Sequence, residues 1–185
     1  MKKWIVFVSV LLNGTVLFAQ RTVNNPHALM KPSSNIIDNL GRAKDFTILL
    51  SAINQANLTE TFKGSEPVTL FAPTDEAFEK LPKDRLDTLF KPNHAADLIF
   101  LLSSHIIKGR VTVKDIVEKI KANNGQAVFT TLAGSKLAAR INGNRNIVLT
   151  DENGSESMIS QFDIAQSNGI LHIINAVLMP KLPGM

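Results

Sequence analysis

The side chains best suited to acid–base or metal chemistry are four widely spaced histidines, His27, His94, His105 and His172. No pair of them matches a helical metal motif such as HExxH, and the chain has no cysteine that could supply a thiolate ligand. His105 and His172 lie among apolar residues, where a neutral imidazole bonded to a backbone carbonyl is the usual arrangement. We therefore expect no metal ion, no cofactor and no catalytic histidine.

Acidic side chains gather in two short segments that could suggest chemical sites. Asp75, Glu76 and Glu79 could act as paired acids, but carboxylates at a helix start are also explained by the helix dipole. Residues 151–156 have some features of a calcium loop without its twelve-residue ligand pattern, and Asn153-Gly154 indicates a hairpin turn instead. The sequence contains no nucleophile-elbow, zinc or phosphate-loop motif, so we predict that the chain is not an enzyme.

Basic side chains cluster in the middle of the chain, where Asp115 and Glu118 reduce the net positive charge of the cluster. The members of this cluster are Lys108, Arg110, Lys114, Lys119 and Lys121. Two interpretations remain open. The cluster is either the solvated face of a helix or a contact surface for an acidic polysaccharide or a membrane, and such a contact would weaken as the salt concentration rises.

Composition narrows the class of protein further. A chain of 185 residues that is 44% hydrophobic and 19% charged can form one globular domain with its own core. The formal net charge is +4, and it falls to +2 if Lys2 and Lys3 are removed with an export signal. Nucleic-acid-binding domains carry a much stronger basic bias, so we exclude nucleic acid as a partner.

The N-terminus has the pattern of an export signal of the bacterial kind. Lys2 and Lys3 precede an apolar stretch over 4–12, and Ala19 precedes the expected cleavage site. An uncleaved N-terminal anchor is the alternative. No later stretch is long and apolar enough to span a bilayer, so we expect a secreted, periplasmic or cell-surface protein without a transmembrane segment after cleavage. The predicted segments are a signal peptide over 1–19, a leader over 20–34, a domain over 35–180 and a tail over 181–185.

Helical patterns dominate the first half of the expected domain. Asp45, Thr74 and Thr112 are the predicted N-caps, and Thr112 with Asp115 resembles a capping box. Apolar spacing and caps predict helices over 45–53, 74–81, 82–90, 97–103 and 112–120, with one short strand over 67–72.

Strand patterns dominate the second half. Alternating residues separated by Asn-Gly-rich turns predict strands over 126–132, 137–141, 147–150, 157–164 and 169–179. The last of these is apolar on both faces and should therefore be covered on both sides. Helices followed mainly by strands indicate an α+β fold rather than alternating βαβ units.

Three separated blocks resemble the fasciclin-type adhesion domain in order and approximate spacing: 69–78, 104–109 and 168–180. The resemblance covers about 35–180, with Ser104 in place of the family's usual tyrosine and Asn175 where the family often has aspartate. It implies a single-domain, secreted bacterial member whose fold is a compact β-sandwich or wedge with a helical half packed alongside. The residues that carry the motif are Thr69, Phe71, Pro73, Thr74, Asp75, Phe78, His105, Asn168, Gly169, His172 and Pro180.

The same resemblance implies adhesion to cells, matrix proteins or glycans rather than catalysis. An Asp-Ile pair before the last block contributes to integrin binding in some animal members, and the matching residues here are Asp163 and Ile164. A carboxylate beside an exposed apolar residue could ligate a receptor's metal ion. The alternative is that Ile164 belongs to the core and Asp163 closes a turn.

We therefore expect an exported, non-enzymatic module that binds an extracellular or envelope protein or glycan, with a membrane-surface contact as a further option. The candidate contacts are Asp163, Ile164, Lys108, Arg110, Lys114 and Lys121. A carrier of an apolar lipid or pigment is the second candidate, because ten phenylalanines and five methionines could line a cleft. A hydrolase that uses His105 or His172 is the third.

Overall fold

A computed structural model describes residues 29–63 and 66–181. The predicted signal peptide, most of the predicted leader and residues 182–185 lie outside the described residues. The helices are α1 (Ile36–Arg42), α2 (Thr47–Gln55), α3 (Asp75–Glu79), α4 (Lys83–Leu89), the 3-10 turn η1 (Pro92–His94), α5 (Ala95–Ser103) and α6 (Val113–Ala122). The strands are β1 (Val68–Pro73), β2 (Ile106–Lys108), β3 (Gln126–Thr130), β4 (Lys136–Ile141), β5 (Ile147–Thr150), β6 (Glu156–Gln166) and β7 (Gly169–Ile174).

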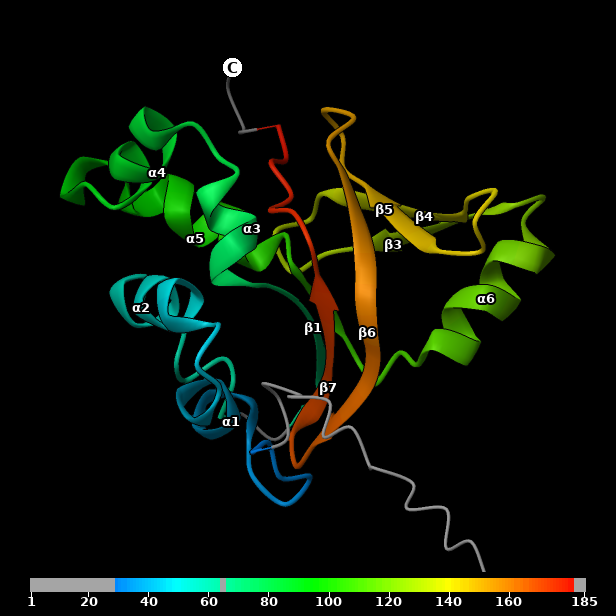
Figure 1. Cartoon of the computed structure of the whole chain (residues 1–185), viewed down its shortest axis with the longest axis horizontal. Helices are drawn as coiled ribbons and strands as arrows, with labels where there is room; N and C mark the ends of the chain where they lie inside the picture. Colours follow the sequence, from blue (N-terminus) through cyan, green and yellow to red (C-terminus); the bar gives the residue numbers. More distant parts are fainter. Residues whose placement is uncertain (1–28, 64–65, 182–185) are drawn as a thin grey trace, which may run out of the picture.

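The strands form one seven-stranded sheet in the order β2-β1-β7-β6-β5-β4-β3 (Figure 1). Among the strand pairs of the described residues, β1–β7 is the only parallel one. The two ends of the sheet meet through a bridge between Ile107 and Thr131, and the Leu132 N–H donates to the Ile106 carbonyl at 2.8 Å. The predicted sandwich is therefore one bent, nearly closed sheet with helices alongside, and the predicted α+β class is confirmed.

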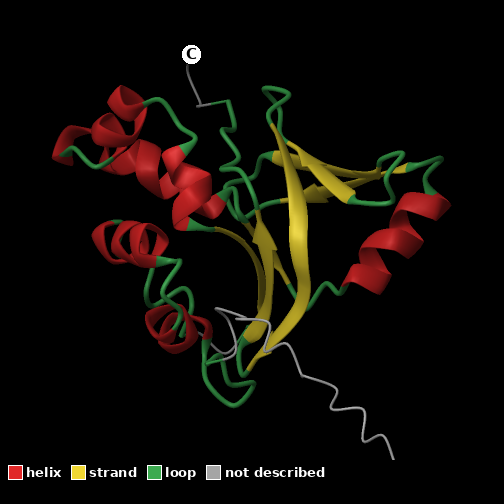
Figure 2. Ribbon diagram, in the orientation of Figure 1, coloured by secondary structure: helices red, strands yellow, loops and turns green. Residues whose placement is uncertain are grey.

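Helices lie on two sides of this sheet (Figure 2). Helices α1 to α5 are grouped on one side, whereas α6 packs near β3 and β4 on the other. Leu171 and Ile173 of β7 belong to the core of the first side, and Ile174 belongs to the core beneath α6. All six residues of β7 are buried, as the two-sided apolar pattern predicts.

Most predicted elements are present, with three informative differences. Helix α2 begins at Thr47 with Phe46 as its N-cap residue, so the prediction of Asp45 as the N-cap was wrong. The carboxylate that accepts N–H groups of the first turn is that of Asp75. Strand β7 ends at Ile174 rather than at residue 179. Helix α1 and strand β2 were not predicted, because a seven-residue helix and a three-residue strand give too little periodicity.

Candidate binding surface

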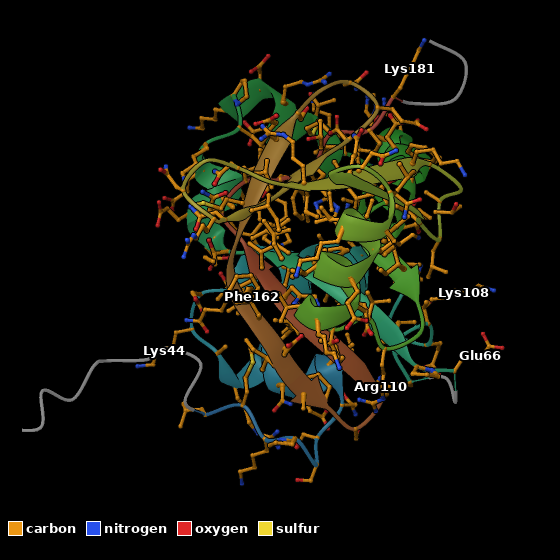
Figure 3. All side chains as sticks on the ribbon, turned by 90° about the vertical axis from the view of Figure 1, so that its right-hand side faces the viewer. Lys44, Glu66, Lys108, Arg110, Phe162 and Lys181 are labelled. Carbon is orange, nitrogen blue, oxygen red and sulfur yellow. The ribbon has the colours of Figure 1, made fainter. Side chains whose placement is uncertain are left out.

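The side of the molecule that carries α6 presents most of the basic cluster. Figure 3 looks onto this side, with α6 in front and Lys108 projecting at its edge. Lys114, Lys119 and Lys121 are exposed on α6 itself. The Lys114 Nζ lies 3.8 Å from the Glu118 carboxylate, and the Lys119 Nζ lies 4.3 Å from the centre of the Phe129 ring. The first contact is a solvent-exposed ion pair and the second is a cation–π contact, and both leave the ammonium groups at the surface.

A groove of about 340 Å³ opens on the same side, where β2 and β3 diverge beyond their bridge. Lys108 and Lys119 contribute its cationic side chains, Thr130 its hydroxyl, and Ile107 and Val111 part of its apolar wall. These residues come from β2, the following loop, α6 and β3. The sequence could not indicate this groove, because nothing in it shows that the two ends of the sheet meet.

The loop before α6 is fixed by buried polar side chains. The Thr69 hydroxyl donates to the Gly109 carbonyl at 2.7 Å and accepts the Val111 N–H at 2.8 Å. The His172 Nε2 donates to the Val111 carbonyl at 2.9 Å. Thr69 and His172 are fully buried on adjacent strands. Two family-motif residues therefore fix the loop that leads into α6.

Arg110 ties this loop to the turn between β6 and β7. Its guanidinium donates to the carbonyl oxygens of Gln166, Ser167 and Gly169 at 3.0, 2.7 and 2.7 Å. Carbonyl oxygens carry no net charge, so these bonds position Arg110 without neutralising it. Arg110 is thus a positioning residue that also adds positive charge to this side of the molecule.

Asp163 and Ile164, the predicted receptor-binding pair, lie at an irregular point of β6. Asp163 has a φ of +56°, and its carboxylate accepts the Val113 N–H at the start of α6 at 2.8 Å. Its own N–H donates to His172 Nδ1 at 3.2 Å. Ile164 is partly buried against the main core, whereas the neighbouring Phe162 is 42% exposed. The geometry gives Asp163 a positioning role at α6 and places Phe162, which the sequence analysis missed, at the surface.

Helix α6 starts with the predicted capping box. The Thr112 hydroxyl accepts the Asp115 N–H at 3.2 Å, and the Asp115 carboxylate accepts the Thr112 N–H at 2.8 Å. Hydrogen bonds from the Thr112 side chain and backbone lower the pKa of Asp115. The helix is therefore capped locally by Asp115 and from across the fold by Asp163.

Both motif histidines are buried and use both ring nitrogens. His105 Nδ1 donates to the Leu101 carbonyl at 2.9 Å, so Nε2 accepts the Leu178 N–H at 3.1 Å. Burial lowers the pKa of His105 from 6.5 to about 4. Burial also lowers the pKa of His172. Each ring is therefore a neutral structural link, with no nitrogen left for acid–base or metal chemistry.

The remaining motif residues are also structural. Thr74 caps α3, and the Asn168 Oδ1 accepts the Ile36 N–H at 3.0 Å while its amide donates to the Phe62 carbonyl. Phe71, Pro73, Phe78 and Pro180 are buried. At Gly169 a Cβ atom would lie 2.1 Å from the Val68 carbonyl oxygen, so this position accepts no side chain.

The two departures from the family motif are accommodated by short polar contacts. The Ser104 hydroxyl donates to the Phe100 carbonyl at 2.8 Å and accepts from Ser135 at 3.2 Å. Ser135 in turn lies 2.7 Å from the Thr131 hydroxyl, at the bridge that joins β2 to β3. The Asn175 Oδ1 accepts the Met158 N–H at 2.8 Å.

The segment with calcium-loop features is a turn. The Asp151 carboxylate accepts the N–H groups of Asn153, Ser155 and Met179 at 2.9, 2.9 and 2.6 Å. These bonds fix the turn and tie the segment after β7 to it. Among the residues that the structure describes, no three His, Cys, Asp or Glu side chains come together in a way that could hold a metal ion.

A partly open cavity of about 100 Å³ lies between α4, α5 and the segment after β7. Leu89, Leu101 and Met179 line it, together with the pair His94 and Asp97, whose Nδ1 and Oδ2 atoms are 2.7 Å apart. Cavities that enclose organic ligands measure about 300–1,000 Å³. This cavity is too small for a lipid or a pigment.

Replacing Asp75 with alanine should destabilise the protein, because its carboxylate accepts the N–H groups of both Thr47 and Ile48 at 3.1 and 2.8 Å. Loss of a cap costs about 1–2 kcal/mol, and we expect that decrease in the free energy of unfolding measured with urea. Asp87→Ala is the matched control, because Asp87 is exposed on α4 and should change the free energy by less than about 0.5 kcal/mol. Equal free energies of unfolding for the two variants would contradict a capping role of Asp75 at the start of α2.

Within residues 29–63 and 66–181, no helix combines the length and the apolar character that crossing a bilayer requires.

The Fasciclin domain family matches residues 44–180. Protein sll1483 of Synechocystis sp. is 24% identical over 173 residues, which are 91% of this chain and 88% of that protein. Human periostin is 30% identical over 171 residues, which are 92% of this chain and 18% of periostin. MPB70 of Mycobacterium bovis is 28% identical over 141 residues, which are 74% of this chain and 64% of MPB70.

A solved structure shows the same fold. The FAS1 domain pair from the insect cell adhesion molecule fasciclin I matches with a TM-score of 0.68 and 18% identity, over 78% of this chain and 50% of that chain. This chain thus spans about half of the fasciclin I pair and less than a fifth of periostin. The family consists of non-enzymatic adhesion and binding modules. With about three quarters of its length matched, and with the expected α+β fold, this chain belongs to the Fasciclin domain family.

Proposed function

We propose that this protein is an exported adhesion module that binds a protein or glycan of the cell envelope or the extracellular surroundings. The observation that carries the proposal is the α6 side of the molecule, where exposed cations lie on a helix whose first residue and preceding loop are held by four side-chain anchors. Thr69, His172, Asp163 and Arg110 supply these anchors. A rigid, charged surface binds a macromolecule without the ordering cost that a mobile loop incurs.

The contact residues in this proposal are Lys108, Lys114 and Lys121, all exposed on the α6 side. Arg110 and Asp163 act by positioning the loop and the helix, and Ile164 acts through the core. The segment boundaries are part of the same proposal, with export directed by 1–19, a leader over 20–34, the domain over 35–180 and a tail over 181–185. The bond from Asn168 to Ile36 supports a domain that begins at about residue 35.

The carrier function receives less support from the geometry. The cavity beside α5 holds only about 100 Å³, and the groove beside α6 is open and has lysines in its lining. A hollow of about 470 Å³ between α2 and α4 is still more open to solvent and does not enclose a ligand. An apolar ligand would gain little by leaving water for such a groove. Adhesion through the surface therefore accounts for the arrangement better than transport of a lipid or a pigment.

A solid-phase binding assay tests the proposal. Envelope fractions of the source cells, separated into protein, polysaccharide and lipid, are immobilised, and the labelled full chain is applied. We expect saturable binding to the protein or polysaccharide fraction that excess unlabelled chain displaces. Binding to the lipid fraction alone, or no saturable binding to any fraction, would contradict an adhesive function of this kind.

A further inference from the structure

We propose that the groove between β2 and β3 binds an acidic polysaccharide chain through the acid groups of its sugars. This inference rests on the proposed function and gives it a partner class and a position. Lys108 reaches the groove from the end of β2, and Lys119 reaches it from α6. Two cations that line one concave surface favour a ligand whose negative charges repeat along a chain.

Of the two lysines that line the groove, Lys119 is already held by a neighbouring side chain. The Lys119 ammonium lies 4.3 Å from the centre of the Phe129 ring, which limits the rotamers of its side chain. The Lys136 Nζ donates to the Thr130 hydroxyl at 2.8 Å, which brings a third cation beside the groove. A side chain ordered before binding loses less entropy when it meets an acid group.

Three carboxylates of neighbouring segments contact other groups and are not part of the groove lining. Glu118 lies 3.8 Å from the Lys114 ammonium, and Asp115 is part of the capping box of α6. The Glu152 Oε1 accepts the backbone N–H of Lys136 at 2.9 Å, which leaves the Lys136 ammonium with the Thr130 hydroxyl. Lys108 and Lys119 are the charged residues in the groove lining, so they are the charges that a ligand in the groove meets first.

Shape favours a sugar chain over a membrane. The groove is concave, about 340 Å³ in volume, and its lining includes threonine side chains beside the apolar residues Ile107, Val111 and Leu132. Sugar rings offer both C–H surfaces and hydroxyl groups to such a wall. A bilayer is flat, and binding to it takes a cluster of basic residues without interspersed acids or an apolar face that inserts. The exposed face of α6 carries Asp115 and Glu118 among its lysines.

Polygalacturonate is a suitable probe, with neutral dextran and vesicles of phosphatidylglycerol as comparisons. We expect the full chain to bind polygalacturonate at low salt, to lose affinity as salt rises, and to bind dextran not at all. The double variant Lys108→Gln/Lys119→Gln should bind about tenfold more weakly, since two exposed charge contacts together contribute about that factor. Lys83→Gln/Lys91→Gln removes the same charge from exposed positions around α4 and should bind like the unchanged protein.

Each other outcome overturns the inference. No binding to polygalacturonate at low salt excludes this ligand class. Equal weakening by the two double variants assigns the effect to net charge rather than to the groove, and binding to the vesicles alone assigns the surface to lipid. If the chain still binds an envelope fraction in a saturable manner in any of these cases, the adhesive function stands and only the groove proposal fails.

Discussion

Replacing Gly169 with alanine should cost about 3 kcal/mol or more in the free energy of unfolding. A Cβ atom at this position would lie 2.1 Å from the Val68 carbonyl oxygen and 3.1 Å from its carbon, and both atoms belong to the backbone. Gly169 is the first residue of β7, which pairs in parallel with β1, and it lies in register with Val68. Relief of the clash would move β7 away from β1, and both cores are built on these two strands.

Urea unfolding followed by circular dichroism measures this effect. Gly143→Ala is the matched control, because a Cβ atom there would meet nothing within 4 Å. We expect the control to stay within about 0.5 kcal/mol of the unchanged protein. A Gly169→Ala variant that fails to accumulate as folded protein agrees with the account, whereas one as stable as Gly143→Ala contradicts the close approach of β1 and β7.

Acid should weaken the fold through His105. Because burial lowers its pKa from 6.5 to about 4, the folded protein keeps the imidazole neutral while the unfolded chain becomes protonated below pH 6.5. The contribution of the neutral His105 ring to the free energy of unfolding is therefore fully present above pH 6.5. It is lost as the pH falls from 6.5 to about 4. A difference of this size corresponds to about 3 kcal/mol. Burial of His172 acts in the same direction.

The free energy of unfolding at pH 7, 5.5 and 4 tests this account. Glutamine at position 105 keeps a donor and an acceptor but takes up no proton in this range. His105→Gln should be less stable than the unchanged protein at pH 7, because the ring packing and bond geometry are lost, and its stability should fall less between pH 6.5 and 4. Identical pH dependence in the two proteins would show that His105 is not the titrating group.

Local sequence patterns were sufficient to predict most of the helices and strands. The capping box of Thr112 and Asp115 involves residues three apart, and its geometry is fixed by the first turn of the helix. The two apolar faces of β7 indicated a strand covered on both sides, and all of its residues are buried. Such features depend on neighbours in the sequence, which is why spacing and residue type reveal them.

Contacts between distant segments could not be predicted in this way. Asp75 caps α2 from 28 residues away, so the sequence suggested the adjacent Asp45 instead. The groove combines β2 with β3, and Thr69 fixes a loop that follows it by about 40 residues. The same limit applies to the α6 surface, since Asp163 and His172 lie 50 and 61 residues further along the chain than Val113 and Val111, the residues that they bond.

We propose that this module binds its protein or glycan partner through the α6 side, which lies on the right in Figure 1, opposite α4. The most direct test compares two charge-matched double variants in the solid-phase assay with envelope fractions. Lys114→Gln/Lys121→Gln changes the exposed face of α6, and Lys83→Gln/Lys91→Gln changes exposed positions around α4. We predict that the first variant binds about tenfold more weakly and the second binds like the unchanged protein. Equal binding by both variants, or weakening by the second alone, would contradict the claim.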